Sequence, residues 1–290
     1  MSDSSGQQRS GAVRLKLCWI ALSIWLAAAV TTAIWPNPIG EAFALLLPVI
    51  VLVHGSILYG WVGICVYLAV GFTVGFAFEA FSIAYGFPFG HFVHNGDGFK
   101  VAGVAPMALV AYALLGWFAW TIAHIITLDR PFQTHPIARL TLPLVGAFVL
   151  AGVDLPTDPI VGTIEKKFTY TYPSGQFGVP LTNYLGWIVT GWVMFQIFVL
   201  IQHRFPRATA SRSRAFWLLP CLTWLSMIVH LPGRWLRTEP GMVSVGGRSF
   251  VIADIYEAAV ITSLFSVVAV IVFAVARLYS RPGGWDSADG

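Results

Sequence analysis

The segment GVDLPTDPIVGTIEKKFTYTYPSGQFGVPLTNYLGW, residues 152–187, joins two long apolar runs through a polar loop. Two aspartates, Asp154 and Asp158, stand where the first run ends, and Asn183 stands where the second run begins. Apolar runs on both sides of a polar turn are typical of helices that cross a membrane and return. The segment therefore predicts two membrane helices with carboxylates at the edge between them.

The rest of the chain is also rich in apolar residues and poor in charged ones. Of its 290 residues, 57% are hydrophobic and only 10% are charged, and the mean hydropathy is +0.75. The apolar runs are continuous and about 17 to 25 residues long, which suits helices and not the alternating strands of a barrel. We predict an all-α, polytopic integral membrane helix bundle with about eight transmembrane helices. The expected helices cover residues 15–35, 41–58, 61–85, 103–127, 138–154, 178–202, 215–232 and 253–279.

We expect one transmembrane helical domain over residues 15–280. A polar N-terminal tail is expected over residues 1–14 and a disordered C-terminal tail over residues 281–290, because both segments lack a long apolar run. The first apolar run is long enough to span a bilayer, which favours a membrane helix over a cleaved signal peptide.

The positive charges are distributed unevenly between the predicted loops. With the N-terminus in the cytoplasm, the inner segments hold 11 of the 17 Lys and Arg residues. This bias predicts a protein of the bacterial cytoplasmic membrane with both termini in the cytoplasm. In that orientation, several polar residues from different helices gather at the outer end of the bundle. The outer loops hold the other six basic residues, Lys100, Lys166, Lys167, Arg234, Arg237 and Arg248.

Ionisable side chains in or beside membrane helices are costly, so they are functional candidates. Glu79 is the one charged residue of GFTVGFAFEAFSIAYGFPFG, residues 71–90. Apolar surroundings favour a neutral carboxylic acid there, and a neutral acid can donate a proton. The alternative is a helix-end carboxyl that hydrogen-bonds to a neighbouring helix.

Asp154 and Asp158 are four residues apart, but Pro156 and Pro159 argue against a regular helix through them. We therefore expect both aspartates in a turn at the mouth of the bundle. Two carboxylates that lie close together can divide into one acid and one base. The alternative is that DLPTDP only stops a helix. Asn183 is placed to hydrogen-bond a carboxylate or hold a water molecule, with helix capping as its alternative.

The sequence HFVH places His91 and His94 three residues apart. A metal site can be built from such a pair, but we favour a hydrogen-bonding loop and expect no metal. Fingerprints of serine hydrolases, nucleotide-binding loops, zinc proteases and dinucleotide folds are missing, so those classes lose support. A basic stripe with interleaved aromatic residues is also missing, so we expect no nucleic acid partner. No cofactor is expected.

Two pairs of segments resemble the signatures of a known family, the carotenoid biosynthesis membrane proteins. EAFSIAYGFPFGHF (79–92) followed by GVAPMALVAYALLGW (103–117) resembles its first signature. DLPTDPIVG (154–162) followed by GQFGVPLTNYLGW (175–187) resembles its second. The family includes the carotenoid 1,2-hydratases and the bisanhydrobacterioruberin hydratases. The resemblance covers residues 40–202.

The resemblance implies a cofactor-independent hydro-lyase that adds water to the terminal double bond of an acyclic polyisoprenoid. A carboxylic acid would protonate the alkene, and water would capture the tertiary carbocation. Asp154 or Asp158 is then the proton donor, while Glu79 and Asn183 position water or tune that acid. Aromatic and histidine side chains near the signatures are candidate substrate contacts, with packing as their alternative. These candidates are Phe78, Phe81, Tyr85, His91, His94, Tyr184 and Trp187.

The chain also departs from the family pattern. GVAPMAL stands where the family has GVPL, and the loops HNGDGFK (94–100) and EKKFTYTYPSGQ (165–176) differ from the aromatic-rich family versions. These departures leave the substrate open. A proton-initiated cyclase is a close alternative, and a small proton-coupled transporter is an alternative of a different class. The expected partners are a long-chain carotenoid, membrane lipid and other enzymes of the pathway.

Overall fold

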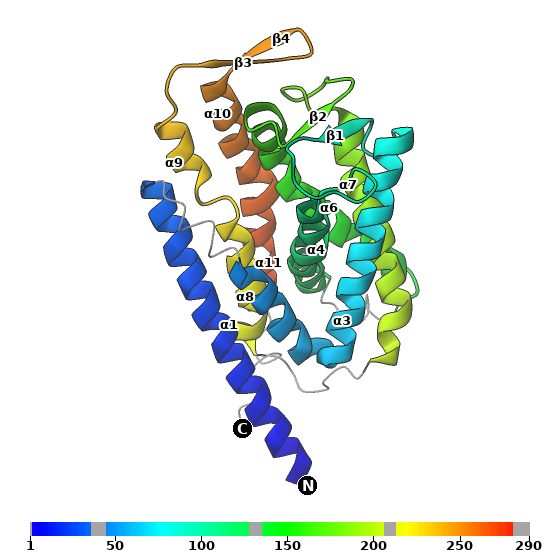
Figure 1. Cartoon of the computed structure of the whole chain (residues 1–290). Coiled ribbons are helices and arrows are strands. Elements are labelled where there is room, and N and C mark those ends of the chain that lie inside the picture. The colour runs from blue at the N-terminus through cyan, green and yellow to red at the C-terminus, as the bar shows by residue number, and fades with distance from the viewer. Residues whose placement is uncertain (1, 36–44, 128–134, 206–212, 281–290) are drawn as a thin grey trace.

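A computed structural model of the chain describes residues 2–35, 45–127, 135–205 and 213–280. Long helices run through the molecule, and two small antiparallel pairs of strands lie at one end of it (Figure 1). The helices are α1 (Ser2–Ile34), α3 (Leu46–Tyr85), α4 (Pro106–Ile126), α6 (Ala138–Asp158), α7 (Leu181–Ile201), α8 (Arg214–Ser226), α9 (Leu231–Leu236), α10 (Ile252–Ser263) and α11 (Ala269–Tyr279). A short π-helical segment, η2 (Pro159–Ile164), continues α6, and a second one, η4 (Leu264–Val268), joins α10 to α11. A 3₁₀ turn, η3 (Gln202–Arg204), ends α7. The strands are β1 (Phe92–His94), β2 (Phe168–Tyr170), β3 (Met242–Val245) and β4 (Arg248–Val251).

The described residues contain seven helical stretches that are long and apolar enough to cross a membrane. The prediction of a polytopic helical membrane bundle is therefore confirmed. The count differs by one because the helices predicted over 41–58 and 61–85 form a single element, α3. At the N-terminus, α1 begins at Ser2, inside the segment expected to be a polar tail. The predicted tail over 281–290 lies outside the described residues.

A break at Gly60 divides α3 into two parts. As one straight helix, its 40 residues would be about 60 Å long, twice the roughly 30 Å of a hydrocarbon core. Gly60 has φ 69° and ψ 171°, a backbone conformation that glycine adopts at little cost. Figure 1 shows that the chain changes direction within α3, so each part is short enough to fit the bilayer. The sequence predicted the end of one helix and the start of the next at residues 58–61, and the break at Gly60 lies there, although both parts belong to α3.

Helix α4 lies at the centre of the bundle and packs against α3, α6, α8 and α11. Its side chains Trp117, Phe118 and Trp120 are completely buried. Lipid tails are as apolar as these side chains, so close packing and hydrogen bonds, more than escape from water, hold such helices together. Helix α7 approaches α6 closely at Gly191, where an added Cβ would lie 3.3 Å from the Ala147 Cα.

The end of α6 differs from the turn that the sequence predicted around Asp154 and Asp158. Asp154 and Asp158 lie within α6, one helical turn apart, and not in an irregular turn. Pro159 lacks the N–H that would bond the Leu155 carbonyl, but the Gln176 side-chain amide donates to that carbonyl at 3.4 Å. The chain then widens into the π-helical η2, which absorbs the proline. Two prolines therefore leave the helical spacing of the aspartates intact.

The strands and loops cover the end of the bundle where α3 and α6 finish and where α4 and α7 start. Strand β1 pairs antiparallel with β2, so that Phe92 faces Tyr170 across the pair. The β3–β4 hairpin lies against the loop before α7, where the rings of Phe177 and Phe250 meet edge to face at 5.6 Å. In Figure 1 both pairs of strands lie at the same end of the molecule.

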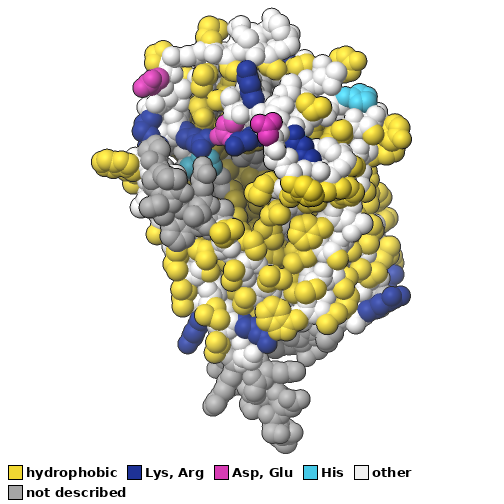
Figure 2. Space-filling model, viewed as in Figure 1, with side chains coloured by type: hydrophobic (Ala, Val, Ile, Leu, Met, Phe, Trp, Pro, Cys, Tyr) yellow, Lys and Arg dark blue, Asp and Glu magenta, His cyan; other side chains and the backbone are white. Residues whose placement is uncertain are grey.

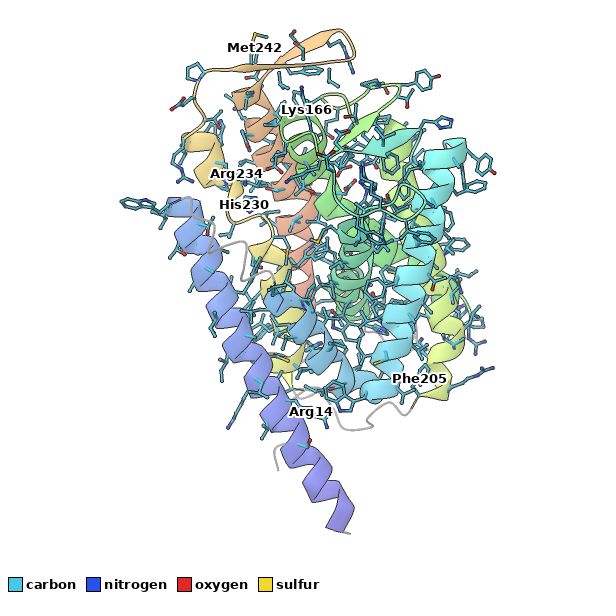
Figure 3. All side chains as sticks on the ribbon, in the orientation of Figure 1. Arg14, Lys166, Phe205, His230, Arg234 and Met242 are labelled. Carbon is cyan, nitrogen blue, oxygen red and sulfur yellow. The ribbon has the colours of Figure 1, made fainter. Side chains whose placement is uncertain are left out.

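Charged side chains lie mainly at the two ends of the bundle. Figure 2 shows a broad apolar band, bordered at one end by side chains of both signs and at the other by Lys and Arg. In Figure 3, Lys166 and Arg234 lie at the end with the strands, and Arg14 lies at the opposite end. An apolar band between two charged borders is the surface expected of a protein that crosses a bilayer.

Substituting Gly60 with Ala tests the break in α3. No atom lies within 4 Å of an added Cβ at Gly60, so the cost comes from the backbone conformation alone. We expect the free energy of unfolding to fall by about 1–3 kcal/mol, measured by denaturant titration in detergent. Gly11, in α1, is the matched control because an added Cβ there also meets nothing within 4 Å. Gly11→Ala should leave stability unchanged or raise it, and equal effects at the two positions would contradict the interpretation.

Candidate active site

A cavity of about 520 Å³ lies beneath the strands, between the ends of four helices. Its walls come from the last turns of α3 and α6, the first turns of α4 and α7, and strands β1 and β2. Most of the lining is apolar, and its volume is in the range of small-molecule sites, about 300–1,000 Å³. The polar side chains in the lining are Glu79, His94, Asn95, Tyr112, Asp154, Thr157, Asp158, Lys167, Tyr170 and Asn183.

Asp154 and Asp158 are joined by one amide. The Asn183 Nδ2 donates one hydrogen bond to Asp154 Oδ2 at 2.9 Å and another to Asp158 Oδ2 at 2.6 Å. All three side chains are at most 7% exposed. The hydrogen bond that the sequence suggested for Asn183 is present, and it reaches both carboxylates. Because α6 keeps its helical spacing, both carboxylates point to the same side and one amide can serve both.

Tyr170, on β2, lines the cavity together with the two aspartates. Its hydroxyl is within hydrogen-bonding reach of Asp158, and the side chain is buried on β2. Burial raises the pKa of Tyr170 well above its ordinary value, and the nearby carboxylates of Asp158 and Asp154 raise this pKa further. The phenol therefore stays protonated and can donate a hydrogen bond at any physiological pH.

Glu79 forms a second carboxylate group on the opposite pair of helices. The Tyr112 hydroxyl, on α4, donates to Glu79 Oε1 at 3.2 Å. His94 Nε2, on β1, lies 2.9 Å from Glu79 Oε2. Glu79 is 6% exposed, so both of its oxygens are held by protein groups inside the cavity wall. The alternative interpretation, a helix-end carboxyl bonded to its neighbours, also describes this geometry, so the role of Glu79 stays a prediction.

Aromatic rings form much of the remaining wall. The rings of Tyr112 and Trp187 lie 4.4 Å apart and are tilted by 32°. Phe89 and Phe92, both buried, belong to the same cluster and line the cavity beside them. Faces of aromatic rings attract positive charge, so this wall suits a cationic group or intermediate.

The cavity opens at the edge of the bundle. Met107 lines it and is nevertheless 74% exposed, and Asn95 and Lys167 on the other side of the opening are exposed as well. Ala108 and Ala111, one turn apart on α4, are half-buried at the same border. One side of the opening is thus apolar and the other is polar, as at the boundary between hydrocarbon and headgroups.

The structure brings six of the eleven predicted site residues to this cavity, and their roles remain predictions. These six are Glu79, His94, Asp154, Asp158, Asn183 and Trp187. Tyr85 and His91 line a separate pocket of about 430 Å³, so the two histidines do not share a site. Among the described residues, no group of three or more His, Cys, Asp or Glu is placed to hold a metal ion.

The other three predicted substrate contacts lie outside the cavity lining. Phe81 is 48% exposed and packs against Tyr85, with the ring centroids 4.7 Å apart. Phe78 is partly buried and packs between the two apolar clusters. The Tyr184 hydroxyl donates to Gln176 Oε1 at 2.9 Å, so this side chain supports the loop that satisfies the end of α6.

Sequence reasoning missed Tyr112 and Tyr170. Tyr112 is a lone hydroxyl inside the apolar run GVAPMALVAYALLGW, and the cost of burying an unpaired hydroxyl is a signal that would have singled it out. Tyr170 carries no such signal, because it is one of three aromatic residues in the loop FTYTYP and nothing in the sequence distinguishes it from Phe168 or Tyr172. Only the pairing of β1 with β2 places Tyr170 over the aspartates.

Together, the fold and the cavity define an integral membrane protein with buried carboxylates that face a largely apolar space at one end of a helix bundle. A family model described as carotenoid biosynthesis protein matches residues 39–244, which is more than half of the chain. The chain therefore belongs to the carotenoid biosynthesis protein family. The match extends beyond residue 202, where the resemblance in the sequence ended, and includes α8, α9 and most of β3. Comparisons with curated proteins and with solved structures gave no match.

Replacing Asn183 with Leu tests the amide between the aspartates. The substitution keeps the volume but removes both donors, leaving two buried carboxylates without their shared partner. We expect the free energy of unfolding to fall by about 1–3 kcal/mol, measured in detergent. In an Asp158→Asn background the loss should be smaller, because one carboxylate is already neutral. Leu185→Ala, on the half-exposed face of the same helix, is the control and should change stability by less than about 0.5 kcal/mol. Additive effects of Asn183→Leu and Asp158→Asn would show that the interaction between Asn183 and Asp158 contributes nothing to stability.

Proposed function

We propose that the protein is a cofactor-independent hydratase that adds water to the terminal C=C bond of a carotenoid or related polyisoprenoid. One observation carries the proposal: two separate groups of buried carboxylates line a largely apolar cavity that opens at the membrane border. Membership of the carotenoid biosynthesis family supports a substrate of this class. Acid–base groups in an apolar cavity are what the hydration of an unactivated alkene needs.

Asp154 and Asp158 supply the acid in this proposal. Their carboxylates are buried, close to each other and held by the neutral amide of Asn183. Two such carboxylates share a proton, because two adjacent buried charges of the same sign repel strongly. The shared proton goes to the terminal alkene, and the positive charge then forms on the tertiary carbon.

The aromatic wall supports the second half of the reaction. The tilted rings of Trp187 and Tyr112 line the same cavity as the two aspartates, and the faces of such rings stabilise a nearby cation. The cavity has room for the end of a long polyene and not for all of it, given its volume of about 520 Å³. We therefore place the rest of the chain in the bilayer beside α4, where Met107, Ala108 and Ala111 border the opening.

The orientation of the bundle is part of the proposal. Lys166 and Arg234 lie at the cavity end, and Arg14 lies at the opposite end (Figure 3). The topology predicted from the sequence assigns 11 of the 17 Lys and Arg residues to segments at the opposite end and six to the cavity end, namely Lys100, Lys166, Lys167, Arg234, Arg237 and Arg248. The excess of basic residues favours the opposite end as the cytoplasmic one, so that both termini are cytoplasmic and the cavity faces outward in a bacterial inner membrane. Membrane lipid and other enzymes of the pathway are the partners expected there.

Two other functions use the same groups. A cyclase would capture the cation with an internal double bond, and the aromatic wall suits that reaction equally well. A proton-coupled transporter would use carboxylates along its path, usually near the midplane. Here the polar cavity residues lie in the end turns of α3, α4, α6 and α7, at one end of the bundle, which favours an enzyme. The experiment below distinguishes all three.

The hydratase is tested by producing the protein in a bacterium that makes lycopene. Liquid chromatography with mass spectrometry of the pigments should detect a more polar product, heavier than lycopene by one or two water molecules. Asp154→Asn and Asp158→Asn should each lower its formation by at least about 100-fold, because the acid is lost. A product of unchanged mass and altered retention would identify a cyclase. Unchanged lycopene, with the protein verified in the membrane, would count against hydration of this substrate and favour transport.

Narrowing the opening tests the path of the substrate. Ala111→Phe places a ring at the half-buried border of the cavity. We expect KM for the polyene to rise or turnover to fall by at least about tenfold, since a bulky side chain competes for the same space. Leu109→Phe is the control: Leu109 belongs to the same helix but does not line the cavity, so its substitution should leave activity near the wild-type value. Equal activity of the two variants would contradict the proposed path.

A further inference from the structure

The two carboxylate groups of the cavity differ in their hydrogen-bond partners. Asp154 and Asp158 have only neutral partners: the Asn183 amide and the Tyr170 phenol. In the part of the chain that the structure describes, neither aspartate forms an ion pair with a Lys, Arg or His. Glu79, in contrast, pairs with His94 at 2.9 Å.

The difference in partners suits the two groups to different roles. Nothing beside the aspartates offsets a second negative charge, so the group holds a proton in its resting state. Glu79 accepts a hydrogen bond from Tyr112 and lies against an imidazole, and both interactions stabilise a carboxylate. The cavity thus has two carboxyls that can supply a proton on one wall and a carboxyl–imidazole pair that can accept one on another.

We infer that the Glu79–His94 pair is the base that activates the attacking water. This inference rests on the proposed hydratase function and adds a catalytic role for His94, which the sequence had suggested as a loop hydrogen-bonding residue and a substrate contact. Tyr112 is a positioning residue, because its hydroxyl holds Glu79 and its ring lies against Trp187.

The electrons and protons balance in two steps. First, the O–H bond of the aspartate group breaks, and the alkene π electrons form a C–H bond at the less substituted carbon, leaving a cation on the tertiary carbon. Second, a lone pair of water forms the C–O bond, and one O–H bond of that water breaks as its proton moves to Glu79–His94. The resting state returns when this proton passes through cavity water to the aspartate group. No oxidant, reductant or cofactor takes part in this scheme.

An exchange experiment in D₂O separates the two roles. Membranes that contain the protein are incubated with lycopene in D₂O, and both the hydrated product and the recovered lycopene are analysed by mass spectrometry. Loss of the base leaves the acid able to deliver a deuteron to the alkene. The C–H bond to the other hydrogen of that same carbon can then break, its electrons re-form the double bond, and the released proton returns to the aspartate group, so the deuterium stays in the alkene. Glu79→Gln and His94→Gln should therefore still place deuterium in recovered lycopene, while hydration falls by at least about 100-fold. Asp154→Asn and Asp158→Asn should lose both exchange and hydration.

Two further variants complete the test. Tyr112→Phe should lower kcat by about tenfold with little change in KM and retain exchange, because only the orientation of Glu79 is lost. Glu79→Asp, which keeps the charge on a shorter side chain, should restore part of the hydration that Glu79→Gln loses. The amount of each variant in the membrane, and its melting temperature in detergent, establish that it is folded.

The outcomes are distinguishable. Wild-type hydration at Glu79→Gln would overturn the assignment, and so would loss of exchange together with hydration in folded Glu79→Gln and His94→Gln, since Glu79 would then belong to the acid. If the wild-type protein neither hydrates lycopene nor exchanges deuterium into it, the proposed function itself fails on this substrate, whatever the variants do.

Discussion

The hydrogen bonds from Asn183 to Asp154 and Asp158 are the interaction on which the rest of the site depends. Burying one carboxylate in an apolar bundle is costly, and burying two beside each other is possible only when their oxygens are satisfied. The amide does this from the first turn of α7, so α6 and α7 must approach closely. The contact of Gly191 with Ala147 allows that approach further along the same pair of helices. The cavity therefore exists because two helices are held near enough for one side chain to reach two others.

Much of the fold could be predicted from the sequence, since continuous apolar runs define membrane helices with little ambiguity. The prediction for the end of α6 was wrong, because Asp154 and Asp158 lie within the helix and not in a turn. A missing N–H at Pro159 was taken to end the helix, whereas the Gln176 amide satisfies the free Leu155 carbonyl and η2 absorbs the distortion. Gln176 is 21 residues away along the chain. Compensation by a residue so distant cannot be deduced from a local pattern.

The residues of the candidate site also differ in how far the sequence predicts them. Charged residues in apolar runs stand out, so Glu79, Asp154 and Asp158 could be selected from the sequence alone. Aromatic residues are abundant in such a chain, and choosing among them needs the three-dimensional arrangement. Phe81 belongs to the same signature as Glu79 but lies on the exposed face of α3. Tyr112, from another helix, supplies the hydroxyl that holds Glu79.

The position of the cavity at one end of the bundle bears on the fate of a product. Under the proposed function, a hydroxyl group formed there would arise at the level of the lipid headgroups, where it would meet water and polar lipid groups on leaving. The rest of a long rigid polyene would already lie in the hydrocarbon, so the product would leave with its new polar end anchored and its length directed across the bilayer. A hydrocarbon core of roughly 30 Å is comparable to the length of such a chain. The enzyme would then set the orientation of the pigment as well as its chemistry, with no separate insertion step.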